Sequence, residues 1–320
     1  MSFIEVKDLK VHYPIRGGFF NKGIDYVYAV DGVNFTIEKG KTYGLVGESG
    51  SGKSTIGKAI IGLEKIKSGK IIYEGKEIDG KFRNRRSEYN RNVQMIFQDS
   101  LSSLNPKKRV IDLISEPLRN FENLTSDEEK RKVSELLEIV GMNREDIYKY
   151  PHEFSGGQRQ RLGIARAVAT KPKLIIADEP VSALDLSVQA QVLNYMKDIQ
   201  EQFGLSYLFI SHDLGVVKHM CDYMFIMYRG RFVETGTKND IYKNPEHFYT
   251  KRLIAAIPEV HPEKRLENKK RRIEIEKEYL KNEKKYYDEN GRVFDLKKLT
   301  DTHFVAIKDE IMQNNGKGGK

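Results

Sequence analysis

The sequence predicts an α/β fold in which a largely parallel sheet alternates with helices. Residues 174–177 and 207–210 are short continuous apolar runs bounded by turns, which is typical of strands buried on both faces of a parallel sheet. Between them, apolar side chains recur at helical spacing from Val188 to Ile199. This alternation of strand, helix and strand indicates a parallel sheet with right-handed crossovers.

The N-terminal part of the chain contributes further short elements. Apolar or alternating runs predict strands over 3–6, 33–37, 43–46 and 70–73. The glycine-rich residues 17–23 indicate a loop inserted between the first two strands. A helical segment over 54–63 follows the third strand, so that a strand, a loop and a helix succeed one another.

The middle of the chain has the periodicity of helices. From Asp99 to about residue 151, apolar side chains fall on helix faces at Val110, Leu113, Ile114 and Leu118, and again at Leu136, Leu137 and Val140. This pattern predicts a helical subdomain. Further along, residues 223–228 and 231–234 flank an Arg-Gly turn and predict a β-hairpin.

The C-terminal residues 261–320 predict a charged helical extension. Leu266, Ile273, Leu280 and Tyr287 recur every seven residues, but the second apolar column of a coiled coil is missing. We therefore expect a docked or weakly stable helix rather than an oligomerisation zipper. The last residues, 314–320, are rich in Asn, Gly and Lys and are expected to be disordered.

Composition and charge narrow the class of protein. The formal charge of +9 admits nucleic acid, an anionic membrane surface or phosphorylated ligands, but both signs are mixed along the tail, which favours a solvated surface. No run approaches the roughly 20 apolar residues that cross a bilayer, and the start of the chain does not resemble a signal peptide. We expect a cytosolic protein. The single cysteine, Cys221, excludes an internal disulfide and predicts a packed thiol.

A glycine-rich loop follows the strand over 43–46. It reads Gly47, Glu48, Ser49, Gly50, Ser51, Gly52, Lys53, Ser54, which is the Gly-x-x-x-x-Gly-Lys-Ser pattern of a phosphate-binding loop (Walker A, or P-loop). Glycine lets successive backbone N–H groups point at a phosphate, and the following helix adds its positive end. We expect Lys53 to reach the β- and γ-phosphates, the Ser54 hydroxyl to bind Mg²⁺, and Thr55 to touch the α-phosphate side.

Two acids stand at the carboxyl end of the strand over 174–177. Open parallel sheets bind ligands at this edge, so Asp178 is expected to hold the metal ion and Glu179 to accept a proton from an attacking water. The alternative for this pair alone is a strand followed by polar turn residues, which the loop upstream disfavours.

A third motif, Phe154 followed by Ser155, Gly156, Gly157 and Gln158, precedes a helix over 158–169. Its hydroxyl and bare N–H groups open that helix, which is the arrangement of an N-cap and of an anion site. The motif, placed between the phosphate loop and the Asp-Glu strand, resembles the signature motif of ATP-binding cassette (ABC) ATPases. In that family it caps the γ-phosphate that is held by a second cassette.

Further matches extend the resemblance from about residue 3 to 260. Gln98 resembles the glutamine of the family's Q-loop, which reaches Mg²⁺ and the lytic water and whose loop touches the membrane subunit. Ser182 to Asp185 resembles the D-loop between paired cassettes, and His212 resembles the switch histidine at the γ-phosphate. Taken singly, such a glutamine is usually solvent-facing and such a histidine is as often a helix cap.

An aromatic residue for stacking on adenine is also expected from the resemblance. Tyr13 matches its position in the family, and Tyr26 or Tyr28 could serve instead. The fold implied is an α/β P-loop NTPase core with a mixed sheet, an antiparallel β subdomain and an α-helical subdomain over about 99–165. The ABC ATPase domain then covers 1–260.

Two segments narrow the subfamily. Residues 98–106 and 244–253 resemble the oligopeptide and dipeptide importer ATPases, particularly the F-type subunit. The family's usual His-Pro-Tyr-Thr appears here as His247, Phe248, Tyr249 and Thr250. The D-type paralogues often carry a C-terminal cysteine cluster, and its absence here favours the F-type.

The resemblance implies an ATPase that uses ATP and Mg²⁺ to power peptide import from the cytoplasmic face of the membrane, as a peripheral subunit. The implied partners are a paralogous D-type ATPase in a heterodimer, two integral membrane permease subunits and, through them, an extracytoplasmic peptide-binding protein, with no nucleic acid. The alternatives are a soluble ABC ATPase acting on nucleic acid or ribosomes, an importer ATPase for another solute such as nickel, and a non-catalytic cassette. A second copy of the chain could also replace the paralogue.

Overall fold

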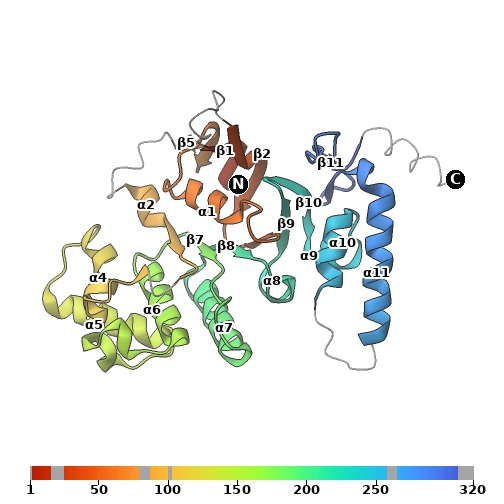
Figure 1. Ribbon diagram of the computed structural model, residues 1–320. Coiled ribbons are helices and arrows are strands. Elements are labelled where there is room, and N and C mark those ends of the chain that lie inside the picture. The colour runs from red at the N-terminus through yellow and green to blue at the C-terminus, as the bar shows by residue number, and fades with distance from the viewer. Residues whose placement is uncertain (1, 16–24, 79–86, 100–102, 258–264, 309–320) are drawn as a thin grey trace.

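The computed structural model describes residues 2–15, 25–78, 87–99, 103–257 and 265–308. Within these ranges the chain forms two sheets with helices around them (Figure 1). The loop expected over 17–23 and the disorder expected over 314–320 lie outside the described residues. The α/β fold with a mixed sheet, an antiparallel subdomain and a helical subdomain is confirmed. The boundaries at 260 and at 99–165 stay predictions.

The larger sheet has eight strands in the order β11-β12-β10-β9-β3-β8-β7-β6. The run from β9 to β6 is parallel, and β10, β12 and β11 continue it as antiparallel strands. Its strands are β3 (Thr42–Val46), β6 (Val93–Ile96), β7 (Leu174–Asp178), β8 (Ser206–Ser211), β9 (Tyr223–Tyr228), β10 (Arg231–Thr237), β11 (Leu296–Lys298) and β12 (Phe304–Ala306). Every residue of β3, β7 and β8 is buried, as expected for continuous apolar runs inside a parallel sheet.

The smaller sheet is antiparallel, in the order β2-β1-β4-β5. Its strands are β1 (Ser2–Ile15), β2 (Asp25–Glu38), β4 (Ser68–Tyr73) and β5 (Lys76–Glu77). One core lies between this sheet and the larger one, and helix α1 (Lys53–Ile60) contributes Ile56 and Ile60 to it. The strands expected over 3–6, 33–37 and 70–73 lie inside β1, β2 and β4. The strand expected over 43–46 is part of β3 in the larger sheet, and the hairpin expected at 223–234 is β9 and β10.

Helices cover the opposite face of the larger sheet and form a second core. They are α4 (Val110–Arg119), α5 (Ser126–Ile139), α6 (Gly156–Val168), α7 (Leu186–Phe203), α8 (Leu214–Met220), α9 (Lys238–Lys243) and α10 (Phe248–Ala255), with 3₁₀ turns η1 (Arg144–Tyr148) and η2 (Pro151–Glu153). The short helix α2 (Glu88–Asn92) instead contributes Tyr89 to the first core. In Figure 1, α4, α5 and α6 stand together as a separate group of helices. Helix α5 starts at a capping box of Thr125 and Glu128, which explains where its periodic run begins.

The C-terminal extension is helical only over α11 (Arg265–Asn282) and a short 3₁₀ turn, η4 (Glu283–Lys285), within the described residues. Helix α11 docks on α10, where the rings of Phe248 and Tyr279 stack with centroids 4.9 Å apart. Ile273 and Leu280 of the seven-residue column are 48% and 69% exposed, so the docked face is a different one. The helix is therefore docked, but Ile273 and Leu280 do not make the contact; of the column, Tyr287, which follows the helix, is buried.

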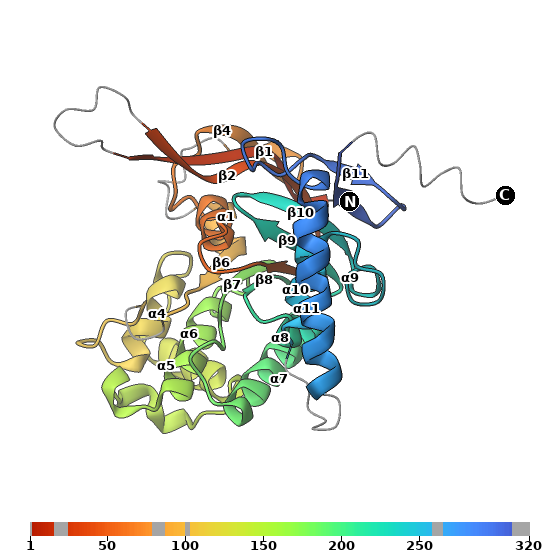
Figure 2. The same cartoon turned by 45° about the vertical axis from the view of Figure 1, so that its right-hand side comes forward.

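Beyond η4 the chain returns to the larger sheet, which the helical expectation for 261–320 did not include. Strand β12 pairs with β10, and β11 pairs with β12, so the extension adds the outer edge of the sheet (Figure 2). The runs over 296–298 and 304–306 are only three residues each, too short to give a strand periodicity. Tertiary pairing, rather than local pattern, fixes them as strands.

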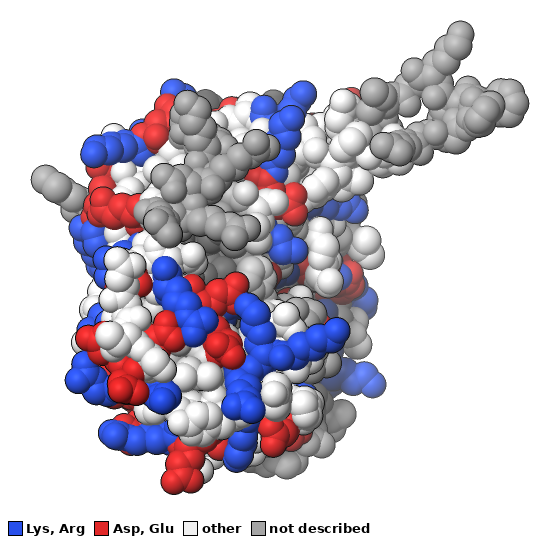
Figure 3. All heavy atoms as spheres, turned by 90° about the vertical axis from the view of Figure 1, so that its left-hand side faces the viewer, with Lys and Arg blue, Asp and Glu red and all other residues white. Residues whose placement is uncertain are grey.

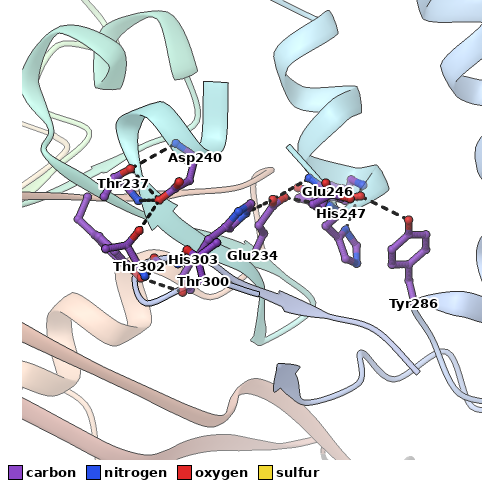
Figure 4. Close-up of polar contacts among 12 residues, drawn as sticks. Glu234, Thr237, Asp240, Glu246, His247, Tyr286, Thr300, Thr302 and His303 are labelled. Carbon is purple, nitrogen blue, oxygen red and sulfur yellow. Dashed lines mark hydrogen bonds and ion pairs between the residues drawn. The ribbon is translucent and has the colours of Figure 1, made fainter. Parts of the chain in front are cut away.

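A buried polar network joins β12 to β10 (Figure 4). Nε2 of His303 lies 2.7 Å from Oε1 of Glu234, whose side chain is fully buried. The same carboxylate accepts hydrogen bonds from the backbone N–H groups of Glu246 and His247, at 2.8 and 3.1 Å. The hydrogen bond that the imidazolium of His303 donates to the carboxylate of Glu234 raises the pKa of His303, since it stabilises the charged ring. The network thereby fastens the C-terminal extension to the larger sheet.

Candidate functional site

An open cleft of about 1250 Å³ lies beside the glycine-rich loop. Most of the loop and the carboxyl ends of β6, β7 and β8 line one part of it, as expected for the ligand-binding edge of a parallel sheet. The lining comprises Val27, Tyr28, Ala29, Asp31, Glu48, Ser49, Gly50, Gly52, Lys53, Ser54, Thr55, Gln98, Glu179, His212, Arg229, Gly230, Leu253, Asn290, Gly291 and Arg292.

The loop conformation depends on glycine at two positions. Gly52 has φ of 106°, and a Cβ there would lie 2.0 Å from the carbonyl oxygen of Ala29. A Cβ on Gly47 would lie 2.2 Å from the carbonyl oxygen of Met227. Both oxygens belong to strand backbones and cannot move without distorting β2 or β9. Gly47 and Gly52 must therefore lack a side chain where the loop passes between these strands.

Lys53 closes the loop on itself. Its Nζ donates hydrogen bonds to the carbonyl oxygens of Gly47 and Glu48, each at 2.8 Å, and the residue is only 4% exposed. Burial lowers the pKa of Lys53, while the negative charges of Glu179 and Asp178 oppose that shift. The buried hydroxyl of Ser51 has no hydrogen-bond partner among the described residues, so the loop holds an unsatisfied polar atom next to a cation.

Ser54 and Asp178 meet across the sheet edge. Oγ of Ser54 donates to Oδ1 of Asp178 at 2.8 Å. Asp178 ends β7 and is 3% exposed, and burial raises the pKa of its carboxyl group. A hydroxyl and a carboxylate oxygen side by side are hard oxygen donors of the kind that Mg²⁺ takes. Among the described residues no group of three or more His, Cys, Asp and Glu side chains is arranged to hold a metal ion, so a cation here would need oxygens from a ligand.

Glu179 is the meeting point of the predicted catalytic residues. Its Oε2 accepts a hydrogen bond from Nε2 of Gln98 at 2.9 Å, and its Oε1 lies 3.1 Å from Nδ1 of His212. The side chain is 12% exposed, and the backbone has φ of 46°, a left-handed conformation that is uncommon outside glycine. Strain of this kind concentrates at functional positions, here where the carboxylate is aimed into the cleft.

The signature residues lie elsewhere. Ser155 caps α6, accepting from the N–H of Gln158 at 3.3 Å, while Oε1 of Gln158 accepts from the N–H of Ser155 at 2.9 Å. Ser155, Gly156 and Gln158 are exposed, and the cleft lining, as far as the described ranges show, contains none of residues 155–158. A Cβ on Gly157 would lie 2.5 Å from Cγ1 of Val188, so that glycine lets α6 approach α7. The structure therefore does not bring this motif to the chain's own phosphate loop.

The predicted D-loop residues, 182–185, connect the cleft at Glu179 to the exposed start of α7. The N–H and the hydroxyl of Ser182 both donate to the carbonyl oxygen of Glu179, at 3.3 and 3.2 Å. Asp185 stands at the N-cap of α7 and is exposed, and the next residue, Leu186, is 85% exposed. A rigid turn thus links the cleft carboxylate to an exposed apolar side chain.

Of the three tyrosines considered for adenine, Tyr28 lines the cleft. Tyr13 is 37% exposed and, in the described part of the chain, is not among the lining residues. Burial raises the pKa of Tyr13, as does its hydrogen bond with Glu64, while a hydrogen bond with Thr55 opposes the shift. Tyr13 therefore stands over the start of α1, next to the lining residue Thr55.

Sequence reasoning missed one part of the lining. Asp31, Arg229, Asn290, Gly291 and Arg292 come from β2, the β9–β10 turn and the C-terminal extension. The Asn-Gly dipeptide at 290–291 is a turn signal, but nothing local indicates where that turn would lie. Only the return of the chain to the larger sheet brings it to the cleft.

Two family models match the chain. One, described as ABC transporter, covers residues 30–182, and the other, described as oligopeptide/dipeptide transporter, C-terminal region, covers residues 233–289. The first range contains the glycine-rich loop, Asp178 and Glu179, and the second contains the first part of the C-terminal extension.

Named relatives agree with these matches. The chain is 56% identical over 306 residues to the oligopeptide transport ATP-binding protein OppF of Lactococcus lactis subsp. lactis (strain IL1403), covering 96% of each chain. It is 45% identical over 267 residues to the dipeptide transport ATP-binding protein DppF of Escherichia coli (strain K12), covering 83% of this chain and 80% of DppF. A solved structure described as a dimer of MJ0796, a bacterial ABC transporter cassette, matches with a TM-score of 0.63 at 25% identity, covering 73% of this chain and 98% of that chain.

Proposed function

This chain belongs to the ATP-binding subunits of ABC transporters for oligopeptides and dipeptides, and from that premise we propose how its residues work. The chain binds and hydrolyses ATP, and the hydrolysis powers peptide import through a membrane transporter. The roles of individual residues, the metal ion, the partner subunits and the side of the membrane are the proposal.

The glycine-rich loop holds the triphosphate. Lys53 already occupies the concave side of the loop through two backbone carbonyl groups, and an incoming phosphate adds an anionic partner to its ammonium group. The unsatisfied hydroxyl of Ser51 gains an acceptor at the same time. Thr55, in the first turn of α1, would contact the α-phosphate, and Tyr13 of β1, which forms a hydrogen bond with Thr55, would stack on the base.

Mg²⁺ fits between Ser54, Asp178 and Gln98. The first two already share a hydrogen bond of 2.8 Å, and the phosphate oxygens would supply the ligands that the chain lacks. When bound, Mg²⁺ would neutralise the charge on the phosphate oxygens during cleavage. Gln98 is anchored to Glu179, which keeps its amide at the edge of the metal site.

Glu179 acts as the general base for the attacking water. Its carboxylate is fixed on both sides by Gln98 and His212, so it points into the cleft rather than to solvent. Proton transfer to such a positioned carboxylate contributes about 10²–10⁴-fold to rate. The side chain of His212 is more than half exposed, so it can exchange its contact with Glu179 for one with a γ-phosphate.

The observation that carries the proposal is the position of the signature motif, exposed at the start of α6 and outside the chain's own cleft. We infer that residues 155–158 act on ATP held by a second cassette, and that a second signature completes this chain's cleft. The exposed Leu186 beside Asp185 fits the same pairing surface. ATP then joins the pair, and hydrolysis releases it, which is a population shift between open and closed states.

The second cassette is a paralogous D-type subunit, and the pair binds two integral membrane permease subunits that receive peptide from an extracytoplasmic binding protein. Among the described residues no helix is both long and apolar enough to cross a membrane. We place the chain at the cytoplasmic face, as a peripheral subunit. A groove of about 610 Å³ between β6 and the helical subdomain, lined by Phe97, Glu116 and Gln160, is the surface we assign to a permease segment.

The alternative of a nucleic-acid-binding ATPase is not favoured. On the face in Figure 3, Lys and Arg side chains are interspersed with Asp and Glu rather than gathered into a basic patch. Ion pairs also occupy several basic side chains among the described residues, as in Arg119–Glu129 and Lys132–Glu122. Paired charges do not supply the counterion release that drives nucleic-acid binding. The peptide-type relatives likewise do not favour a nickel importer.

A test separates action in cis from action in trans. The Ser155→Arg variant should leave ATP affinity of the isolated chain unchanged and abolish ATP hydrolysis at the partner's phosphate loop in the reconstituted transporter. Ser126→Arg, at the exposed start of α5, is the matched control. Peptide uptake into liposomes should depend on Ser155 in the same way. Loss of ATP affinity in isolated Ser155→Arg would overturn the paired arrangement.

A further inference from the structure

The C-terminal extension reaches the nucleotide cleft. Asn290, Gly291 and Arg292 line it together with the phosphate loop, although both matched family regions end before residue 290. We propose that the turn 288–292, here called the tail turn, is part of the nucleotide site and that Arg292 binds an anionic oxygen of the bound nucleotide. This rests on the proposed function, since it needs ATP in this cleft.

The tail turn is built in advance. Oδ1 of Asp288 accepts hydrogen bonds from the N–H groups of Asn290 and Arg292, at 2.9 and 2.8 Å. The N–H of Asp288 donates to the carbonyl oxygen of Arg292 at 2.9 Å, and Gly291 has φ of 71°, a conformation suited to glycine. The turn therefore presents Arg292 with little conformational entropy left to lose on binding.

Arg292 is fastened to the strand that flanks the phosphate loop. Its Nη2 and Nε lie 2.8 and 3.0 Å from Oδ2 of Asp31, a side chain that is 13% exposed. Asp31 follows closely on Ala29, whose carbonyl oxygen is the one that excludes a side chain at Gly52. The guanidinium group is thereby held at the cleft while remaining 54% exposed.

An aromatic path also connects the extension to the phosphate loop. The ring of Tyr287 lies 5.6 Å from that of Tyr228, and Tyr228 lies 4.6 Å from Tyr249. The hydroxyl oxygen of Tyr249 accepts a hydrogen bond of 2.9 Å from the N–H of Glu48 in the loop. Tyr287 and Tyr249 are 7% and 1% exposed, so this contact is part of the core rather than a surface encounter. Through these rings the C-terminal extension packs against the glycine-rich loop that is proposed to bind phosphate.

The charges at this wall suit a nucleotide. Arg229 lines the cleft beside the tail turn, because a Cβ on Gly291 would lie 3.2 Å from its Nη1. Arg292 and Arg229 thus add two guanidinium groups to the cleft that contains Lys53. Guanidinium groups recognise phosphate strongly through charge-assisted hydrogen bonds. Asp31 holds Arg292 in place and competes with the nucleotide for it.

The test compares nucleotide affinity among full-length variants, measured by calorimetry with a non-hydrolysable ATP analogue and Mg²⁺. Arg292→Ala should weaken binding about tenfold, as expected for loss of a hydrogen bond to a charged group. Lys298→Ala, which removes one positive charge from an exposed ion pair of the same extension, should bind as wild type does.

Asp31→Asn separates binding from mere docking. If Arg292 contacts the nucleotide, this variant should bind at least as tightly as wild type, because it removes the competing carboxylate. If the ion pair only docks the extension, Asp31→Asn and Arg292→Ala should weaken binding alike, and that result overturns the inference. Hydrogen exchange of residues 284–306 provides the second readout, with protection rising on addition of the analogue in wild type.

The Lys53→Ala variant distinguishes failure of the proposed function from failure of the inference about the tail turn. If wild type binds no analogue, or if Lys53→Ala binds normally, the proposed function itself fails. If Lys53→Ala loses binding but Arg292→Ala matches Lys298→Ala, the nucleotide site stands and the role of the tail turn is refuted.

Discussion

Nδ1 of His212 lies 3.1 Å from Oε1 of Glu179. The two residues belong to different strand ends, and the parallel pairing of Asp178 with Ile210 brings those ends together. The N–H of Glu179 also donates to the carbonyl oxygen of Ile210 at 2.9 Å, which fixes the backbone of Glu179, the proposed base, against β8. A displacement of the end of β7 or of β8 would therefore change the positions of both Glu179 and His212.

Glu179→Gln should leave ATP binding intact and lower hydrolysis by about 10²–10⁴-fold, because the amide keeps the shape of the side chain but accepts no proton. The closed pair should accumulate with ATP. Phosphate release and size-exclusion chromatography of the pair measure the two effects. Glu135→Gln, on the exposed face of α5, is the control. Turnover close to wild type in Glu179→Gln would contradict the assignment.

Lys53→Ala should weaken ATP binding itself by tenfold or more, because the bound phosphate loses the ammonium group that pairs with it. The same change frees the carbonyl oxygens of Gly47 and Glu48, so the loop should also lose order. Equilibrium binding of a fluorescent ATP analogue measures the affinity. Lys65→Ala, an exposed lysine after α1, should have wild-type affinity. Unchanged affinity in the Lys53 variant would remove the loop from the site.

Two glycines of α6 should respond to alanine in opposite directions. In Gly157→Ala the new methyl group would lie 2.5 Å from Cγ1 of Val188, so we expect a loss of about 1–3 kcal/mol in unfolding free energy. In Gly163→Ala nothing lies within 4 Å, and the helix should gain about 0.5–1 kcal/mol. Chemical denaturation measures both. Equal effects would show that α7 adjusts to the methyl group at no cost.

Stability should depend on pH through His303. The hydrogen bond that His303 donates to the carboxylate of Glu234 raises the pKa of His303 above the ordinary 6.5, with Asp240 and Glu246 adding negative charge nearby. The stabilisation is therefore fully present below pH 6.5 and is lost as pH rises through the folded-state pKa. Thermal unfolding across that window should show the loss in wild type and none in Glu234→Gln.

The neighbouring His247 acts in a different window. Burial lowers the pKa of His247 to about 3, so it folds in the neutral form. Because its unfolded-state pKa is near 6.5, this residue lowers stability only as pH falls below that value. The two histidines together predict greatest stability near pH 6.5. A wild-type stability that rises steadily above this pH would contradict the assignment for His303.

Much of the core was predictable from sequence because its strands are buried on both faces. Runs such as 174–177 and 207–210 are apolar without interruption, and no helix of useful length fits between their turns. Strands β11 and β12 were not predictable, because each has three residues and gains its order from pairing with β10. The periodicity of apolar residues within a segment predicts which of its side chains are buried, but it does not predict pairing with a strand that is distant in sequence.

The site divides in the same way. Lys53, Ser54 and Asp178 lie where motif spacing places them, because strand, loop and helix form one local unit. Asp31 and Arg292 are far apart in sequence and meet only through the folded extension. No short motif encodes that encounter. For Tyr13 and Tyr28, the pattern offered candidates, and the structure places Tyr28 in the lining and Tyr13 over Thr55.

The pairing of β12 with β10 also bears on any shortened form of the chain. Removing the residues after 295 would strip β12 from β10 and turn a covered strand into a bare sheet margin. An exposed edge strand presents a row of unpaired backbone N–H and C=O groups to other molecules and promotes self-association. We therefore expect the ATPase part expressed alone to aggregate. In the full chain the extension covers this strand edge and so opposes aggregation.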